Sequence, residues 1–463
     1  MSLITQLDAL DIKRAVLRSI ADYAPNKVIK SCWIAYSGGL DSTVLLHLFA
    51  QSRLASEGIC LQAIHINHGL QADAQQWARH CRKISQQWQV PLTLVEVNAE
   101  NHRGESPEDA ARKARYDAFN TVVNPQAILL TAHQQDDQAE TLLLQLLRGA
   151  GPRGLAAMPE VAPLGLGLQV RPLLGISRQQ LEAYARDHQL IWIDDPSNQD
   201  RRFTRNFIRH EILPQLQSRW PSVSNTLSRS ATVCAETISL CDELASSDFS
   251  DVMDGHEHCL SLTKLLALSA PRQRNLIIYW LRKLNYPVPS YAILHTIQTS
   301  LLQAAKDRQP VVHWAGVAIR RFAGGVYALP YSSSTQAGNW STKSFSWDLV
   351  APLSIPNLGT LSSAQVKGLG IAAQYLAEKK ISIRFRQGGE QIILAGRSGH
   401  QRLKKLFQEA QVPPWERDKI PLLYADDELI AVVGYWYGQA YQVTNAQQGI
   451  HIVFDDLSFR NEN

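Results

Sequence analysis

The chain has 463 residues, of which 45% are hydrophobic and 19% are charged, and its formal net charge is +4. These values indicate a globular protein of about three domains with enough apolar residues for sizeable cores. No apolar run reaches the roughly 18 residues of a membrane span and the N-terminus lacks the features of a secretory signal, so we expect a cytoplasmic protein without membrane contact. The six cysteines form no Cys-x-x-Cys pair, which argues against a zinc site or a disulfide framework.

The first chemical motif follows the first predicted strand. An amphipathic helix is predicted near residues 11–23, and an apolar strand at 32–36 then leads into Ser37-Gly38-Gly39-Leu40-Asp41-Ser42-Thr43, from which a helix continues. Glycines let backbone N–H groups approach a ligand, and a helix start adds donors and a positive dipole end. These donors and the three hydroxyl groups suit an anion with several oxygens, whereas the carboxylate suits Mg²⁺ shared with phosphates.

The spacing of this loop is not that of a Walker A motif. It resembles the pyrophosphate loop of the N-type ATP pyrophosphatases, which split ATP into AMP and pyrophosphate while adenylating a substrate. The resemblance implies that ATP is a co-substrate bound by all seven residues of the loop. The alternative interpretation is a Gly-Gly turn that merely joins a strand to a helix.

Strands and helices alternate up to about residue 193. Strands are predicted at 61–66, 92–97 and 127–132, and helices at 73–88, from Ser106 onward and at 137–147. This alternation predicts an α/β fold with a doubly wound parallel sheet. Ligands of such sheets bind beyond the carboxyl ends of the strands, so His68, at the end of the second strand, is predicted to contact the nucleotide. An ordinary turn histidine is the alternative.

Two further clusters would lie at the same edge of the sheet. In the helix that follows Ser106, Glu108, Arg112 and Arg115 share one face, which is either a nucleotide contact or a solvated ion pair. The strand-to-helix junction at 130–141 carries a histidine and three carboxylates, which are His133, Asp136, Asp137 and Glu140. Acidic residues there complement the helix dipole, but they also suit Mg²⁺ or an ammonium group, and the histidine could stabilise or move charge.

A basic segment comes next. Between residues 201 and 209 there are four arginines and no acidic residue, interleaved with Phe203 and Phe207. This pattern suits contact with phosphates and stacking on bases. A basic amphipathic helix that packs by its phenylalanines is the alternative.

The character of the chain changes after Pro214. Long helical patterns with few strand signals cover 215–244 and 260–302, a β-like run covers 311–329, and the polar stretch at 331–342 is typical of a linker. We therefore expect a catalytic domain at 1–214, a mostly helical domain at 215–330, a linker at 331–345 and a small mixed α/β domain at 346–463.

The last domain holds the basic excess of the chain. Residues 381–420 contain eight lysines and arginines against four acidic residues, an excess equal to the net charge of the whole protein. A strand and a helix that both carry cations look like a clamp on a phosphate backbone, although a solvated face is possible. The candidate residues are Arg384, Arg386, Arg402, Lys404 and Lys405.

Together these segments resemble the tRNA(Ile)-lysidine synthetase family over nearly the whole chain. The specific part of the likeness is the combination of the glycine loop with other motifs, namely His68-Gly-Leu, Glu108-x-x-Ala-Arg-x-x-Arg-Tyr116, Ala132-His-Gln-Gln-Asp-Asp-Gln-Ala-Glu-Thr141, Leu146-Leu-Arg-Gly149, Asp195-Pro-Ser-Asn198, Phe203-x-Arg-Asn206 and Lys404-Lys-Leu-Phe407. The resemblance implies a catalytic domain followed by two domains that grip tRNA.

The resemblance also implies the reaction. ATP would adenylate the C2 oxygen of the wobble cytidine in the isoleucine tRNA with a CAU anticodon, releasing pyrophosphate. The side-chain amine of free L-lysine would then attack C2 and displace AMP, giving lysidine and changing codon reading from AUG to AUA.

Site roles follow from the same likeness. Mg²⁺ would bind Asp41 and Asp136, and Arg112 would lie near a carboxylate or phosphate. Asp137 and Glu140 would receive ammonium or metal charge; whether Asp137 is a metal ligand, a lysine ligand or a base stays open. The further active-site candidates are His133, Arg205 and Asn198.

Three competing functions remain. A tRNA 2-thiolation enzyme of the same loop type usually carries paired cysteines, which this chain lacks. A glutamine-dependent synthetase would need an amidotransferase domain with a nucleophilic cysteine, and none is evident in the sequence. An RNA-binding module that kept a nucleotide fold as scaffold is opposed by the intact loop and acidic turn. A homodimer is left open.

Overall fold

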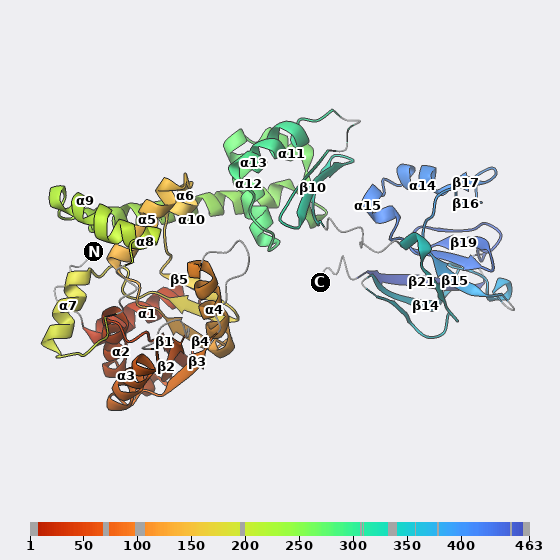
Figure 1. Cartoon of the computed structure of the whole chain (residues 1–463). Helices are drawn as coiled ribbons and strands as arrows, with labels where there is room; N and C mark the ends of the chain where they lie inside the picture. Colours follow the sequence, from red (N-terminus) through yellow and green to blue (C-terminus); the bar gives the residue numbers. More distant parts are fainter. Residues whose placement is uncertain are drawn as a thin grey trace. The chain divides into compact units, whose positions relative to one another are not determined.

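The structure is a computed structural model that describes residues 8–67, 74–97, 107–194, 200–305, 308, 310–331, 340–356, 358–376, 379–444 and 447–456. The chain divides into two compact units, Met1–Cys241 and Asp242–Asn463. Their border falls inside the long helix α10 (Val223–Val252), which is labelled in Figure 1.

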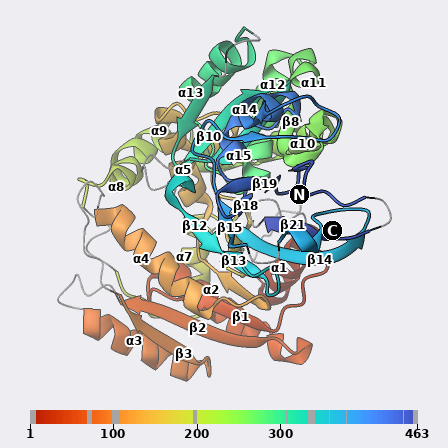
Figure 2. The same cartoon turned by 90° about the vertical axis from the view of Figure 1, so that its right-hand side faces the viewer.

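The first unit is built on a six-stranded sheet with the order β3-β2-β1-β4-β6-β5. β1 pairs in parallel with β2 and β4, and β3 forms one edge (Figure 2). At the other edge β5 and β6 form an antiparallel hairpin, which the sequence analysis did not predict. The parallel-sheet fold is thus confirmed, with strands β1 (Ser31–Ala35), β2 (Cys60–Asn67), β3 (Leu92–Glu96), β4 (Ala127–Leu130), β5 (Val161–Leu164) and β6 (Gly167–Val170).

Helices cover both faces of this sheet because its strands are apolar on both sides. In β1, Cys32 and Ile34 pack into the core that also contains residues of α1, α2, α3 and α7, whereas Trp33 packs with Phe119 of α4 and with Val123, which follows that helix. Figure 1 accordingly shows α2 and α3 on one side of the strands and α4 on the other. The helices are α1 (Ala9–Tyr23), α2 (Leu40–Gln51), α3 (Ala74–Gln87), α4 (Pro107–Val122), α5 (Gln135–Leu147), α6 (Pro152–Leu155) and α7 (Arg178–Asp187), with a 3₁₀ turn at Leu54–Glu57.

A helical segment with one wide turn follows the sheet. It consists of α8 (Thr204–Phe207), a π-helical turn (Ile208–Ile212) and α9 (Leu213–Arg219). Ile208 and Leu213 are buried against Ala139 of α5. This packing fixes the basic segment of the sequence against the helix that carries the acidic cluster. The predicted domain border at residues 214 and 215 falls inside α9.

The second unit begins with the end of α10 and a five-stranded antiparallel sheet of order β7-β8-β11-β10-β9. Its helices pack on the sheet around the fully buried Trp280. Helices prevail at 260–302, as predicted. The elements are β7 (Met253–Asp254), β8 (His256–Ser261), α11 (Leu262–Ala267), α12 (Ala270–Lys283), α13 (Tyr291–Thr296), a π-helical turn (Ile297–Leu302), β9 (Val311–Trp314), β10 (Val317–Phe322) and β11 (Gly325–Pro330).

The C-terminal part of this unit is mixed α/β, as predicted, with strands in the majority. One sheet has the order β12-β15-β18-β19-β20 and another the order β13-β14-β21. The elements are β12 (Ser344–Ser346), β13 (Leu353–Ile355), β14 (Gly359–Lys367), β15 (Ile381–Arg384), β16 (Gln391–Ile392), β17 (Gln401–Arg402), α14 (Leu403–Glu409), α15 (Pro414–Arg417), β18 (Leu422–Ala425), β19 (Glu428–Val432), β20 (Trp436–Tyr437), β21 (Gln448–Asp456) and the 3₁₀ turns Trp340–Thr342 and Ala373–Tyr375. Within the described ranges, every helix is too short or too polar to cross a membrane.

Candidate active site

The glycine loop between β1 and α2 is organised by its own hydroxyl groups. The Oγ atoms of Ser37 and Ser42 lie 2.9 Å apart, and Ser42 Oγ donates to the carbonyl of Gly39 at 3.0 Å. Gly39 caps α2 without a side chain, so the first N–H groups of the helix, which have no partner inside it, face the loop. This arrangement is suited to binding phosphate oxygens.

Position 38 of the loop requires a glycine. Its φ is +86°, a value that favours glycine, and a Cβ at this position would lie 2.9 Å from Cys81 Sγ. Its carbonyl accepts a hydrogen bond from the backbone N–H of Ile193 at 2.9 Å. The loop is therefore clamped between α3 and the segment that follows α7.

The sheet brings this loop beside the acidic junction. β1 and β4 are neighbours and parallel, so the loop after β1 and the turn after β4 emerge at the same edge. Because the crossovers from these strands leave in opposite directions, this is the position where doubly wound sheets bind their ligands. The sequence predicted this juxtaposition.

Asp41 lies in the first turn of α2 and is paired with an arginine that the sequence analysis did not single out. Both carboxylate oxygens lie 3.3 Å from Nη1 of Arg178, and Nε of the same arginine donates to Glu182 Oε1 at 3.1 Å. Burial raises the pKa of Asp41 to about 6, while Arg178 opposes that rise and the nearby Asp137 adds to it. Asp41 and the acidic junction therefore share one electrostatic environment.

The junction itself begins with a capping box at the start of α5. The backbone N–H of Gln134 donates to Asp137 Oδ2 at 2.9 Å, and the side-chain oxygen of Gln134 accepts from the N–H of Asp136 at 2.7 Å. Asp136 is half-buried, Asp137 is buried, and Glu140 is completely buried. Such burial of two carboxylates requires compensating cations.

Two arginines of the basic segment supply that compensation. Arg205 donates from Nε to Glu140 Oε2 at 2.7 Å and from Nη2 to Asp137 Oδ1 at 3.0 Å. Arg209 donates from Nε to Glu140 Oε1 at 2.6 Å, and its Nη2 reaches Asp137 Oδ1 at 3.0 Å and Glu140 Oε2 at 2.9 Å. We call these four residues the carboxylate–guanidinium cluster.

His133 stands beside this cluster. Its Nδ1 lies 3.0 Å from Thr131 Oγ1, and burial lowers its pKa to about 4, although Asp137 acts in the opposite sense. Arg112 and Arg205 also depress this pKa, which places both cations within electrostatic reach of the imidazole. The guanidinium of Arg112 lies 5.3 Å from the ring centre of Tyr116.

The structure thus gathers, at one edge of the sheet, seven of the residues predicted for catalysis, substrate binding or metal binding. They are Asp41, Arg112, His133, Asp136, Asp137, Glu140 and Arg205. His68 and Asn198 lie outside the described residues. Arg178 and Arg209 are additions: Arg209 belongs to the predicted basic segment but was read only as a phosphate contact, and no local signal marks Arg178.

The predicted tRNA-binding cations of the second unit have unequal surroundings. Arg384 donates to Asp427 Oδ1 at 3.1 Å and lies over the ring of Tyr424, and Arg386 donates to Asp418 at 3.3 Å. By contrast, three cations at the start of α14 are exposed, namely Arg402, Lys404 and Lys405.

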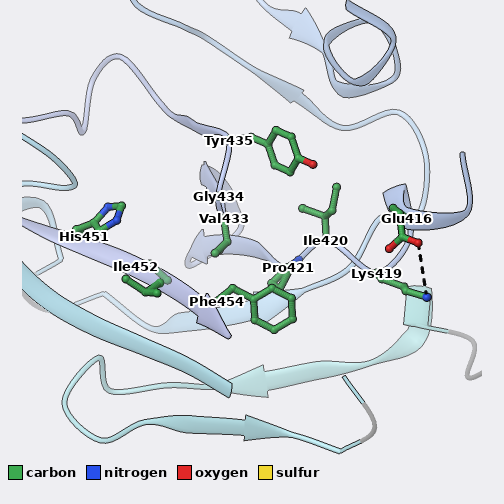
Figure 3. A pocket seen from close by; sticks show the side chains of 11 residues that line it. Glu416, Lys419, Ile420, Pro421, Val433, Gly434, Tyr435, His451, Ile452 and Phe454 are labelled. Atoms are coloured by element: carbon green, nitrogen blue, oxygen red, sulfur yellow. Dashed lines mark ion pairs between the residues drawn. The ribbon is translucent and has the colours of Figure 1, made fainter. Parts of the chain in front are cut away.

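A separate hollow of about 450 Å³ lies in the C-terminal part of the chain (Figure 3). Ile452 and Phe454 of β21 form part of its wall, and Glu416 and Lys419, 4.0 Å apart, stand at one side. None of the predicted site residues lines it.

Comparison with known proteins adds three matching family models. A PP-loop domain matches residues 11–216, a TilS substrate binding domain matches 260–327, and a TilS substrate C-terminal domain matches 381–454. The tRNA(Ile)-lysidine synthase of Coxiella burnetii is 44% identical over 421 residues, which cover 90% of this chain and 92% of that protein. The enzyme of the same name from Methylococcus capsulatus is 42% identical over 91% of this chain and 94% of its own length.

A solved structure is also similar, at a much lower level. The U34-tRNA thiolase NcsA from Methanococcus maripaludis covers 49% of this chain and 79% of its own, with 17% identity and a TM-score of 0.40. These values are too low to support any conclusion about function.

Proposed function

The chain belongs to the tRNA(Ile)-lysidine synthase family, and on that premise we propose which of its residues perform the reaction. The protein is a ligase that uses ATP to form lysidine on tRNA(Ile). The observation that carries the proposal is the meeting of the glycine loop and the carboxylate–guanidinium cluster at one edge of the sheet. An ATP site and an amine site have to adjoin in an enzyme that joins an amine to an adenylated base.

The loop at residues 37–43 binds the phosphates of ATP. Backbone N–H groups at the start of α2 and the hydroxyl groups of Ser37, Ser42 and Thr43 are positioned to neutralise charge as pyrophosphate leaves. Preorganised donors of this kind act strongly because they need no rearrangement during the reaction. His68 is proposed to contact the nucleotide as well.

Asp41 and Asp136 would hold Mg²⁺. The residues fit this ion: they are hard oxygen donors beside a phosphate-binding loop, and their charges act on one another through the pKa of Asp41. No group of three or more His, Cys, Asp or Glu side chains gathers as a metal site among the described residues, so phosphate oxygens would complete the coordination. When bound, the ion would neutralise charge on the leaving pyrophosphate.

Asp137 and Glu140 receive the amine of free lysine. Two buried carboxylates are suited to an ammonium group, and Arg112 and Arg205 are suited to the lysine carboxylate or the adenylate phosphate. His133 is neutral at pH 7 because its pKa is about 4, so its imidazole can accept a proton or hydrogen bond there. Asp137 serves as lysine ligand or as base, and Asn198 is proposed to lie near the amine.

The remaining domains bind the tRNA with the CAU anticodon. We assign 1–214 to catalysis, 215–330 and 346–463 to tRNA binding and 331–345 to a linker; the matches of the two TilS domain models to 260–327 and 381–454 support this division. The proposed contacts are Arg384, Arg386, Arg402, Lys404 and Lys405. We place the enzyme in the cytoplasm, where tRNA, ATP and free lysine occur together, and a homodimer is the oligomer to test by sedimentation.

One assay tests the proposal. The protein is incubated with ATP, Mg²⁺, labelled lysine and bulk bacterial tRNA, and the label in RNA is counted after nuclease digestion and chromatography. We expect ATP-dependent label in a modified cytidine. Absence of lysine from RNA, with ATP still consumed, would reject the amine assignment.

A matched control separates chemistry from binding. Unlabelled ornithine, which is one methylene shorter, should compete only weakly, and tRNA with an adenosine in the wobble position should receive no label. Label in the tRNA with a wobble adenosine, or label in the absence of ATP, would contradict the adenylated-cytidine route.

A further inference from the structure

The oxygens of the two proposed lysine-binding carboxylates are all engaged by groups of the protein itself. Asp137 Oδ2 accepts from the backbone of Gln134, and Asp137 Oδ1 accepts from both arginines. Glu140 Oε1 accepts from Arg209, and Glu140 Oε2 accepts from Arg205 and Arg209. Each of the four oxygens therefore already accepts at least one hydrogen bond from the protein, and guanidinium groups occupy the place that an ammonium group would take on both carboxylates.

The net charge of the cluster indicates that an ammonium group would have to replace a guanidinium. Two carboxylates and two guanidinium groups sum to zero, and Glu140 is completely buried. An ammonium added to this neutral cluster would be an uncompensated buried charge, which is unfavourable. Removal of one guanidinium leaves a net charge of −1, which one ammonium neutralises.

Arg209 is the better placed of the two to leave. Its side chain is the more exposed of the two, with 34% exposure against 25% for Arg205. It also lies in the π-helical turn, a wide turn with weaker geometry than an α-helix and one often found at functional sites.

Arg209 has a second anionic environment close at hand. Burial lowers its pKa, but Glu140, Asp137 and Asp41 together hold that pKa above its ordinary value. Asp41 belongs to the glycine loop, which follows β1 at the same edge of the sheet as the turn after β4 that leads to Asp137, so Arg209 lies on the side of the sheet where ATP is proposed to bind. A nucleotide phosphate near that loop would attract the same guanidinium.

On the basis of the proposed function, we propose that Arg209 fills the ammonium position of the lysine site and that bound ATP draws it away, so that nucleotide binding opens the site for lysine. The two substrates are then thermodynamically coupled, because the guanidinium that lysine must displace gains a new partner in ATP. Arg209 is in this sense a residue that sets the order of binding, and Arg205 stays with the carboxylates.

The test is lysine affinity measured by calorimetry on the full chain, with and without the α,β-methylene analogue of ATP, which cannot be cleaved. In the wild type the analogue should tighten lysine binding by about ten-fold, a typical size for coupling between sites. Arg209→Gln should bind lysine about ten-fold more tightly than the wild type without the analogue and should gain little from it. Arg209→Lys retains the positive charge and should stay weak without the analogue.

The control is Arg219→Gln, which removes an exposed arginine from α9, one helical turn or more beyond the cluster, and should behave as the wild type. Because loss of Arg209 leaves two buried carboxylates with one guanidinium instead of two, lysine should raise the melting temperature of Arg209→Gln more than that of the wild type. A purely structural role for Arg209 would lower the melting temperature without this extra lysine effect.

The experiment distinguishes failure of this inference from failure of the proposed function. Tight, analogue-independent lysine binding by Arg209→Gln supports the inference. Lysine binding by Arg209→Gln that equals the wild type, or an undiminished effect of the analogue, overturns it. If the wild type neither binds lysine in any condition nor attaches it to tRNA, the proposed function fails instead.

Discussion

Asp41 and Glu140 are both acidic residues of the same site, yet their surroundings give them different capacities. Asp41 retains 24% exposure and faces one guanidinium at 3.3 Å, whereas Glu140 has no exposure and accepts three charged hydrogen bonds. Asp41 can therefore exchange its partner for another cation with little rearrangement, and Glu140 cannot.

Asp41→Asn tests this distinction. The change removes the negative charge beside the phosphate-binding loop and preserves the shape of the side chain. We expect release of pyrophosphate to fall by about 10²–10³-fold, the usual effect of losing one electrostatic contact in a transition state. Pyrophosphate release and filter binding of tRNA are the measurements, and tRNA affinity should change little. An equal loss of both would indicate misfolding rather than a chemical role.

His133 predicts a pH dependence of stability. Its folded pKa of about 4 lies below the unfolded value near 6.5, so the fold favours the neutral imidazole. The stabilisation is complete above pH 6.5 and is lost as the pH falls toward 4. Between pH 7 and pH 5 the wild type should lose about 1–2 kcal/mol more unfolding free energy than His133→Gln. Urea unfolding at the two pH values measures this difference, and parallel losses would refute it.

Local sequence signals accounted for the residues of the loop and of the acidic junction because each lies within a few positions of a strand end. These signals did not reveal which arginines pair with the acidic residues. Asp41 and Arg178 are 137 positions apart, and Glu140 and Arg209 are 69 apart. No periodicity links such positions, and only the fold brings them together.

At the scale of elements, the loop after β1 depends on one backbone conformation. Gly38→Ala would force a side chain into a φ of +86° and place its Cβ against Cys81. We expect a loss of about 1–3 kcal/mol of stability together with weaker ATP binding. Thermal unfolding and nucleotide titration measure the two effects.

Gly58→Ala is a matched control for this change. Its φ is +73°, but a Cβ there would meet nothing within 4 Å, so it carries the strain without the collision. Gly38→Ala combined with Cys81→Ala should recover the part of the loss due to the collision. A loss no larger than that of Gly58→Ala would show that the contact with Cys81 does not matter.

The hairpin of β5 and β6 was not predicted because its strands are short. β5 and β6 have four residues each, and Pro163 interrupts the first, so neither shows a run long enough to be distinguished from a turn. The π-helical turn at Ile208–Ile212 could not be predicted either, since its residues have the amphipathic pattern of an ordinary helix. Long apolar strands such as β2, and helices with a clear start such as α5, were predictable because local propensity and tertiary packing agree there.

At the scale of the whole molecule, tRNA affinity should depend most on the exposed cations at the start of α14, of which Lys405 has an acidic neighbour, Glu409, at 3.8 Å. Replacing Arg402, Lys404 and Lys405 together by alanine should lower the salt slope of tRNA binding by about 2–3, because each phosphate contact contributes about 0.7–0.9. Filter binding over a series of salt concentrations measures the slope. Arg384→Ala should change it by less than about one, since that guanidinium already pairs with Asp427.

An isolated anticodon stem–loop provides the control for these variants. It lacks the rest of the tRNA, so the wild type should bind it less tightly and with a smaller slope than full tRNA. The triple variant should show nearly the same slope for both RNAs. A slope for full tRNA that matches the wild type would refute the basic clamp.

The hydrogen bond from Ile193 to Gly38 restricts the length of the chain that follows it. It anchors the polypeptide to the nucleotide loop, and Arg205 follows only twelve positions later. The same short stretch of sequence thus leads from a residue bonded to the glycine loop to an arginine of the carboxylate–guanidinium cluster. We expect an insertion between Ile193 and Arg205 to disturb one of these two contacts, so changes of length should be tolerated less there than in a loop without such contacts.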